Sequence, residues 1–241
     1  EHLDIYKDIN DIKETFIKYA NSIPFYGLIS ICNDSKHAKE IINKINRTIT
    51  TFGINEKSDI TAENIHYQNN TTTFTAVIKE RKVKFELIVP GKHNVYNALA
   101  AISICNTIKI KGKYIKEGLK NFNGVKRRFE MKYEDINKKI NYVDDYAHHP
   151  SEIESTLNSI KTGWPSKRII TIFQPHLYSR TEIFYKEFAK SLLQSDINII
   201  TNIYGSRETK IKNVTSKLIL NELVSMGHSD SFLIPKNNIA K

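Results

Sequence analysis

The chain has 241 residues, of which 40% are hydrophobic, so it is long enough to bury more than one apolar core. No apolar run is long enough to span a bilayer, and no secretory signal pattern is present, which predicts a soluble protein without membrane insertion. The formal charge of +10 arises from lysines scattered along the sequence rather than gathered in a stripe, which disfavours a nucleic-acid-binding module without eliminating it.

The two cysteines, Cys32 and Cys105, lie far apart in separate apolar segments. This pattern indicates buried free thiols in a reducing compartment rather than a disulfide, and it predicts a cytoplasmic protein. The sequence has no initiator methionine, so we expect a fragment of a longer polypeptide.

The first half of the chain alternates helical and extended patterns, which is typical of an α/β domain. In chain order the spacing predicts a helix over residues 8–20, a strand over 26–31, a helix over 35–46, a strand over 48–54, a hairpin within 59–89 around the polar turn 68–70, and helices over 93–108 and 113–122. Pro90-Gly91 ends the hairpin region, and Gly124 follows the last of these helices. We therefore place a domain boundary at Gly124, with domains over residues 1–124 and 125–241.

The second half resumes the strand and helix alternation after the basic run that ends at Glu130. The predicted elements are strands over residues 140–143, 168–173, 197–203 and 232–234, with helices over 182–193 and 216–226. Ser151 and Glu154 have the spacing of a capping box, which predicts another helix that begins there. No internal repeat or low-complexity linker is visible.

Two polar segments, residues 144–150 and 173–181, each follow one of these apolar strands. Open α/β sheets place their chemistry at the carboxyl ends of strands, so we expect acids, imidazoles and a guanidinium to meet in one crevice. The sequence contains neither a G-x-x-x-x-G-K-[ST] phosphate loop nor a G-x-G-x-x-G dinucleotide motif.

Several of these segments, in this order, resemble the Mur ligase family. The similar segments are residues 1–4, 91–101, 124–130, 144–150, 173–176 and 203–208. The resemblance implies an α/β protein made of the later part of a central ATPase domain followed by a Rossmann-like C-terminal domain. It also implies that the nucleotide-sugar domain, the phosphate loop and the end of the C-terminal domain are missing from this chain.

The resemblance implies an ATP- and Mg²⁺-dependent ligase that joins L-alanine to UDP-N-acetylmuramate through an acyl phosphate, in peptidoglycan precursor synthesis. Such a reaction needs positioning and charge neutralisation rather than a covalent protein nucleophile. We expect the chain alone to be inactive. The alternatives are a muropeptide ligase of the same family, which joins a tripeptide to the same nucleotide sugar, and a basic nucleic-acid-binding module.

For ATP, the resemblance implies a binding set of His93, Asn94, Asn97, Arg128 and Asp145. Asn94 and Asn97, three residues apart on a helix, can offer amide groups to one purine edge, and Asp145 can accept ribose hydroxyls. The alternative for the helix residues is that Asn94 caps the helix and His93 is a surface residue. The alternative for Arg128 is a solvated basic linker.

For the amino-acid side, the resemblance implies that Tyr146, His148, His176 and Arg180 bind substrate. It also implies that the last three of these residues are catalytic. A guanidinium at Arg180 can hold a carboxylate through two hydrogen bonds. Leu177 departs from the family pattern, because some relatives carry arginine there.

For metals, the resemblance implies that His2 binds Mg²⁺. A zinc site at His148 and His149 is not expected, because adjacent side chains diverge and no cysteine pair accompanies them.

Overall fold

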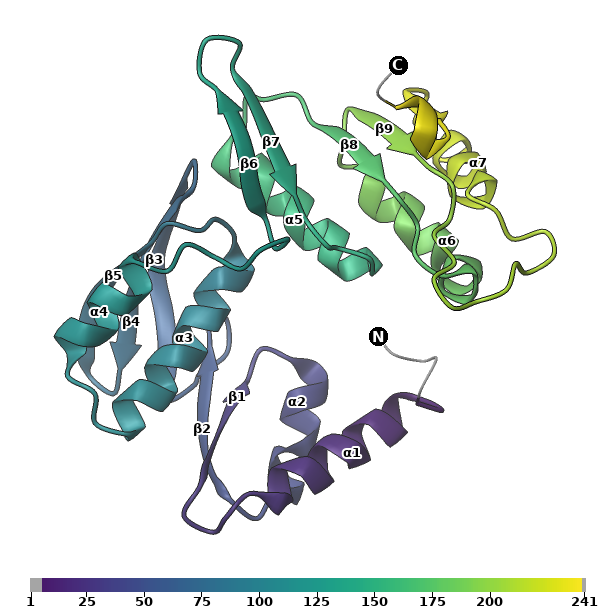
Figure 1. Cartoon of the computed structure of the whole chain (residues 1–241). Helices are drawn as coiled ribbons and strands as arrows, with labels where there is room; N and C mark the ends of the chain where they lie inside the picture. The colour runs from purple at the N-terminus through teal and green to yellow at the C-terminus, as the bar shows by residue number, and fades with distance from the viewer. Residues whose placement is uncertain (1–5, 240–241) are drawn as a thin grey trace. The chain divides into compact units, whose positions relative to one another are not determined.

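The computed structural model describes residues 6–239 and divides the chain into two compact units, Glu1–Gly124 and Val125–Lys241 (Figure 1). Each unit has its own buried core. No helix within residues 6–239 is long and apolar enough to cross a membrane. Cys32 and Cys105 are free thiols, as expected, and are partly rather than fully buried.

Unit 1 is built on a five-stranded sheet whose strands follow chain order from β1 to β5. β1, β2 and β3 are parallel neighbours, whereas β3, β4 and β5 form an antiparallel meander. The strands are β1 (Leu28–Cys32), β2 (Thr48–Gly53), β3 (Ile60–Gln68), β4 (Thr71–Ile78) and β5 (Arg81–Leu87). The helices are α1 (Ile9–Ser22), α2 (Lys36–Ile41), the 3₁₀ turn η1 (Ile42–Lys44), α3 (Lys92–Thr107) and α4 (Gly112–Lys120).

The predicted hairpin around residues 68–70 is confirmed, because Gln68 pairs with Thr71 across the turn between β3 and β4. A second turn at Lys79, which adopts a φ of 57°, adds β5 as a third strand that the sequence pattern did not predict. The predicted helix over residues 35–46 is shorter in the structure, because it ends at Ile41 and continues only as the 3₁₀ turn.

The core of unit 1 lies between this sheet and α3, which packs on β1 and β2, while α4 packs on β5. α3 buries one apolar stripe, as the spacing predicted. The buried residues of the stripe are Val95, Ala98, Leu99 and Ile102, and their neighbours on the sheet include Phe74, Phe85 and Leu87. α3 therefore has a fixed position on the sheet, and its first two turns carry three of the candidate ATP-binding residues.

Asp34, between β1 and α2, connects the sheet to α3 through four hydrogen bonds. Its carboxylate accepts the backbone N–H groups of Ile54, Asn55 and Glu56 at 2.7, 2.9 and 2.7 Å, and the hydroxyl of Tyr96 at 2.7 Å. Burial alone would raise the pKa of Asp34, but these donors lower the pKa to about 2. The folded unit therefore contains Asp34 as an ionised carboxylate, whose hydrogen bonds stabilise the fold.

We expect Asp34→Asn to destabilise unit 1 at neutral pH by about 1 to 3 kcal/mol, since several donors lose a charged acceptor. A pKa that is lower in the folded state contributes stability above pH 4, which is lost as the pH falls toward 2. Urea unfolding followed by circular dichroism tests this, with Glu80→Gln, an exposed change of the same charge, as control. The fluorescence of Trp164, which belongs to unit 2, should not change. An acid response identical to wild type in Asp34→Asn would contradict the prediction.

Unit 2 contains a three-stranded parallel sheet in the order β10, β9, β8, and a separate antiparallel pair, β6 and β7. The strands are β6 (Glu130–Asp135), β7 (Ile140–Asp144), β8 (Ile170–Phe173), β9 (Ile197–Ile200) and β10 (Ser231–Leu233). The helices are α5 (Pro150–Gly163), α6 (Tyr178–Leu192), α7 (Lys217–Ser225) and the 3₁₀ turn η2 (Lys236–Asn238). The core is formed by α5, α6 and α7 together with β8 and β9.

The strand predicted at residues 140–143 exists, but it does not belong to the parallel sheet. It pairs with β6 in a hairpin that turns at Lys139, whose φ is 56°. Ile140 and Tyr142 are exposed on this hairpin, at 51% and 55%, so the strand has one solvated face, as antiparallel sheets allow. β6 contains few apolar residues, and its pairing with β7 was therefore not predicted.

Candidate functional site

The candidate residues fall into two groups. His93, Asn94 and Asn97 lie in the first turns of α3 in unit 1. The other described candidates lie in unit 2; they are Arg128, Asp145, Tyr146, His148, His176 and Arg180. His2, the predicted magnesium ligand, lies outside the described residues.

In unit 1, α3 begins after Gly91, whose φ of 98° lies in the region that favours glycine. The side-chain amide of Asn94 donates to the carbonyl of Pro90 at 2.7 Å, and that of Asn97 donates to Asn94 Oδ1 at 3.3 Å. The alternative in which Asn94 caps the helix is wrong, because Gly91 occupies the cap position. Asn94 and Asn97 nevertheless lie on one face, so their amides can approach a single ligand.

In unit 2, the run at Arg127 and Arg128 forms a tight turn rather than a loose linker. Arg127 and Phe129 both have positive φ, at 59° and 47°. The carbonyl of Arg127 accepts the N–H of Tyr146 at 2.7 Å, and its guanidinium stacks on the ring of Tyr146 at 4.4 Å from the centroid. Arg128 pairs with Glu152 at 3.1 Å while its side chain stays 51% exposed. The guanidinium of Arg128 is therefore held at one edge and open to solvent elsewhere.

The loop from β7 to α5 is held in place by hydrogen bonds to the carboxylate of Asp145. Asp145 accepts the N–H of Ala147 at 3.1 Å through one carboxylate oxygen and the hydroxyl of Thr156, on α5, at 2.5 Å through the other. Each carboxylate oxygen can accept further hydrogen bonds. Asp145 can thus support the loop and bind ribose hydroxyls at the same time.

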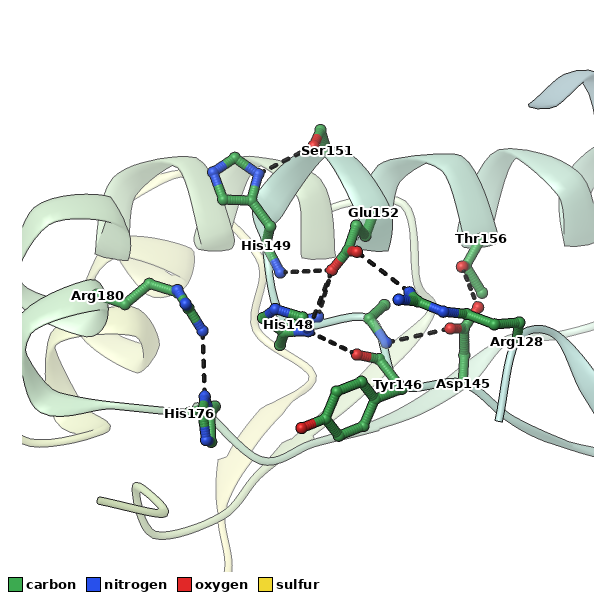
Figure 2. A network of polar contacts seen from close by, with 11 residues as sticks. Arg128, Asp145, Tyr146, His148, His149, Ser151, Glu152, Thr156, His176 and Arg180 are labelled. Atoms are coloured by element: carbon green, nitrogen blue, oxygen red, sulfur yellow. Dashed lines mark hydrogen bonds and ion pairs between the residues drawn. The ribbon is translucent and has the colours of Figure 1, made fainter. Parts of the chain in front are cut away.

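Glu152, in the first turn of α5, lies between this loop and Arg128 (Figure 2). Its Oε2 accepts the N–H groups of His148 and His149 at 2.9 and 3.1 Å and lies 3.3 Å from His148 Nδ1, while its Oε1 pairs with Arg128. Burial alone would raise the pKa of Glu152, but the N–H donors and charges of its partners lower it. Glu152 is therefore an ionised acceptor that contacts both the basic turn and the histidine loop.

This geometry corrects the predicted capping box at Ser151 and Glu154. α5 begins at Pro150, and Glu152 rather than Glu154 reaches back to the free N–H groups before the helix. Pro150 is suited to the first helical position because it has no N–H to satisfy and its φ is already helical. The box predicted from the sequence was two residues too late.

The second loop, from β8 to α6, carries His176 and Arg180. Arg180 Nη1 lies 3.1 Å from His176 Nδ1. Between these residues, Leu177 has φ 71° and ψ 138°, a conformation that costs about 1 to 3 kcal/mol outside glycine. Hydrogen bonds hold Leu177 on both sides: its N–H donates to Tyr204 at 2.9 Å and its carbonyl accepts the hydroxyl of Thr181 at 2.8 Å. Such strain is typical of binding sites.

Glu208 stabilises the N-terminus of α6 through hydrogen bonds. Its carboxylate accepts the N–H groups of Tyr178 and Ser179 at 2.6 and 3.1 Å, and it also accepts the hydroxyl of Ser179. A carboxylate at a helix N-terminus satisfies free donors and the helix dipole together. For this reason α6 begins at Tyr178, four residues before the predicted start at residue 182.

The two loops of unit 2 meet at their histidines. The rings of His148 and His176 lie 6.0 Å apart in an edge arrangement, and His176 also contacts the ring of Tyr204 at 5.7 Å. Burial, the charge of Arg180 and the neighbouring His148 together lower the pKa of His176, which favours a neutral imidazole. Unit 2 therefore brings His148, His176 and Arg180 to one place, as the sequence predicted. Of the two strands that precede these residues, β8 belongs to the parallel sheet and β7 belongs to the separate hairpin.

The sequence analysis missed Glu152, Glu208 and Tyr204. Glu152 stands four residues after His148, a spacing that places both near the first turn of α5. Glu208 and Tyr204 lie in the segment 203–208, which was noted only for its resemblance. No local pattern could show that Glu208 reaches α6, because 29 residues separate it from Ser179.

Within residues 6–239, no group of three or more His, Cys, Asp or Glu side chains could hold a metal ion. Mg²⁺ prefers several oxygen ligands in octahedral geometry. The described part of the chain does not fit a magnesium site made of its own side chains alone.

Comparison with known proteins identifies the family of the chain. The model of the Mur ligase middle domain matches residues 1–105, and the model of the Mur ligase glutamate ligase domain matches residues 127–238. A curated UDP-N-acetylmuramate–L-alanine ligase from Desulforapulum autotrophicum is 42% identical over 231 residues, which cover 95% of this chain and 50% of that protein.

Two crystal structures have the same fold over nearly the whole chain. The UDP-N-acetylmuramate–alanine ligase of Thermotoga maritima matches with a TM-score of 0.78 and 27% identity over 98% of this chain and 49% of that one. The MurF ligase of Thermotoga maritima in complex with ADP matches with a TM-score of 0.73 and 15% identity, over 98% and 50% of the two chains. The chain spans about half the length of the relatives that it matches.

Proposed function

This chain belongs to the Mur ligase family, and from that membership we propose that it is the later part of an ATP-dependent ligase that joins L-alanine to UDP-N-acetylmuramate. The product is a precursor of peptidoglycan. The observation that carries the proposal is the meeting of His148, His176 and Arg180 from two separate loops, because it gathers two imidazoles and a guanidinium, groups that can bind a carboxylate and exchange protons with an amine. The 42% identity to a curated alanine ligase supports the choice of amino acid.

In this reaction ATP phosphorylates the lactyl carboxylate, and the amine of alanine then attacks the acyl phosphate. Catalysis rests on holding anions together and stabilising their charge. Arg128 binds ATP phosphate oxygens with its exposed edge, and Asp145 accepts the ribose hydroxyls. His93, Asn94 and Asn97 bind the adenine. The ADP complex of the MurF ligase supports a nucleotide as ligand of this fold.

On the amino-acid side, the guanidinium of Arg180 holds the alanine carboxylate, and Tyr146 borders the muramyl group. Arg180 is suited to this because its planar fork matches a carboxylate. Mg²⁺ is proposed as the family's cofactor, with His2 as one ligand, and it neutralises phosphate charge when bound. The separate free cysteines support a reducing compartment, and the cytoplasm is the proposed location.

Two alternatives are less well supported. A muropeptide ligase would use the same nucleotide sugar, but the curated relative that is 42% identical is an alanine ligase. A nucleic-acid-binding module would need exposed basic and aromatic side chains in a row. Here Arg127 stacks on Tyr146, so this basic and this aromatic side chain are engaged with each other.

The proposal predicts phosphate release from ATP that requires both UDP-N-acetylmuramate and L-alanine in the full-length protein. The 241-residue chain alone should release none, because its sequence has no phosphate loop and phosphoryl transfer depends on such positioned groups. A coupled phosphate assay that omits each substrate in turn measures this. Release without alanine, or release by the 241-residue chain, would contradict the proposal.

A further inference from the structure

The hydrogen-bond partners of His148 determine which of its ring nitrogens carries the proton. Nδ1 of His148 lies 2.9 Å from the backbone carbonyl of Tyr146 and 3.3 Å from Glu152 Oε2. A carbonyl only accepts, and an ionised carboxylate only accepts. Nδ1 must therefore be the protonated nitrogen, and in the neutral ring Nε2 carries a lone pair. Among residues 6–239, no hydrogen-bond partner faces His148 Nε2.

His176 is in the opposite situation. Its Nδ1 lies 3.1 Å from Arg180 Nη1, and a guanidinium only donates. Nδ1 of His176 must therefore be the unprotonated nitrogen, and the neutral ring carries its proton on Nε2. The low pKa of His176, caused first by burial and then by Arg180, agrees with a ring that stays neutral.

We propose that His148 and His176 are held in opposite tautomers, so that His148 is the general base for the amine and His176 is a hydrogen-bond donor to the reacting carbonyl oxygen. Glu152 is the positioning residue that fixes His148. The inference rests on the proposed function and adds a division of labour between the two rings, which lie 6.0 Å apart and can both face one reacting centre.

The proton balance supports these roles. The alanine ammonium first loses one proton to His148 Nε2, which frees a nitrogen lone pair. That lone pair forms the C–N bond at the acyl carbon while the Nε2–H of His176 donates to the carbonyl oxygen, where negative charge develops. The C–O bond to the phosphate then breaks and its electron pair leaves with the phosphate. A second proton leaves the nitrogen with the phosphate, and the third remains on the amide.

Glu152 acts through its partners rather than on substrate. It accepts the backbone N–H of His148, its Oε2 lies 3.3 Å from Nδ1 of the same residue, and its Oε1 pairs with Arg128. A carboxylate beside a histidine fixes the tautomer and stabilises the charged ring once a proton has been accepted. Glu154, on the same helix and exposed, has no such partner within the described residues and provides a matched control.

The tautomers can be read directly in the 241-residue chain, without any enzymatic activity. Long-range ¹H–¹⁵N correlation spectra of histidine side chains distinguish Nδ1–H from Nε2–H rings at about pH 8, where free imidazole is neutral. His148→Gln and His176→Gln assign the two signals among the eight histidines. We expect Nδ1–H for His148 and Nε2–H for His176. The reverse pattern, or the same tautomer in both rings, would overturn the proposal.

Glu152→Gln should allow a fraction of His148 to adopt the Nε2–H tautomer, because the negative charge near Nδ1 is removed. The Tyr146 carbonyl then remains as the hydrogen-bond acceptor of Nδ1. Glu154→Gln should leave the spectrum unchanged. A His148 signal in Glu152→Gln identical to wild type would overturn the role of Glu152. This spectroscopic readout separates positioning from a purely structural effect on the start of α5, since the glutamine can still accept the N–H groups of the loop.

Kinetics in the full-length protein test the two roles. His148→Gln should lower kcat about a hundredfold or more, because an amide cannot take up the proton. His176→Ala should lose about a hundredfold, and His176→Gln should recover about tenfold of that loss, because its amide N–H replaces the Nε2–H donor. Equal losses in the two His176 variants, or an active His148→Gln, would overturn the roles. If the wild-type protein shows no alanine-dependent phosphate release, the proposed function fails instead, and the tautomer spectra remain a separate test.

Discussion

Replacing Arg180 with alanine in the full-length protein is expected to raise the KM for L-alanine about tenfold to a hundredfold, which corresponds to the roughly 1.5 to 3 kcal/mol of a charge-assisted contact. The reason is the position of Arg180 on the loop from β8, where it contacts His176 and lies close to His148. The KM for ATP should change little, because the proposed adenine and ribose contacts belong to other residues. Steady-state titration of each substrate measures the difference.

Two further variants make the Arg180 test selective. Arg180→Lys should restore the function only in part, because an ammonium group cannot reproduce the planar fork. Arg168→Ala removes the same charge from an exposed position before β8 and should leave both KM values unchanged. A defect in Arg180→Ala that is confined to ATP would show that this loop serves the nucleotide rather than the amino acid.

Arg128→Ala is expected to weaken the binding of ATP by a similar factor, about tenfold to a hundredfold. Arg128 pairs with Glu152 through Nη1 and its side chain as a whole is 51% exposed, so its remaining donors can reach phosphate oxygens. The KM for L-alanine should change less. Lys126→Ala, an exposed change of the same charge two residues earlier, is the control. Unchanged ATP affinity and turnover in Arg128→Ala would place this guanidinium outside the nucleotide site.

Most elements could be predicted from the sequence because their apolar spacing is strong. α3 is the clearest case, since its stripe from Val95 to Ile102 is buried, and β8 and β9 are short apolar runs whose β-branched residues favour strands. β6 was missed because Glu130–Asp135 carries few apolar residues, and its pairing with β7 depends on a turn at Lys139. Sheet membership is a tertiary property that local spacing does not determine.

The candidate site was predictable to a similar extent. His148, His176 and Arg180 were expected together because each follows a strand, and the structure places them together. The residues that hold them were not predictable, because Glu208 contacts α6 across 29 residues of sequence from Ser179. Glu152 was overlooked because the helix start was placed at Ser151. Supporting side chains are recognised by their partners, and partners are known only from the fold.

The central claim is that the loops of unit 2 select L-alanine for transfer to UDP-N-acetylmuramate. In its most direct test, the full-length protein is incubated with ATP, UDP-N-acetylmuramate, and equal amounts of L-alanine and the muropeptide tripeptide. The products are then identified by mass spectrometry. We predict the single-alanine conjugate as the main product, with one phosphate released for each conjugate formed. The tripeptide conjugate as the main product, or no conjugate at all, would contradict the claim.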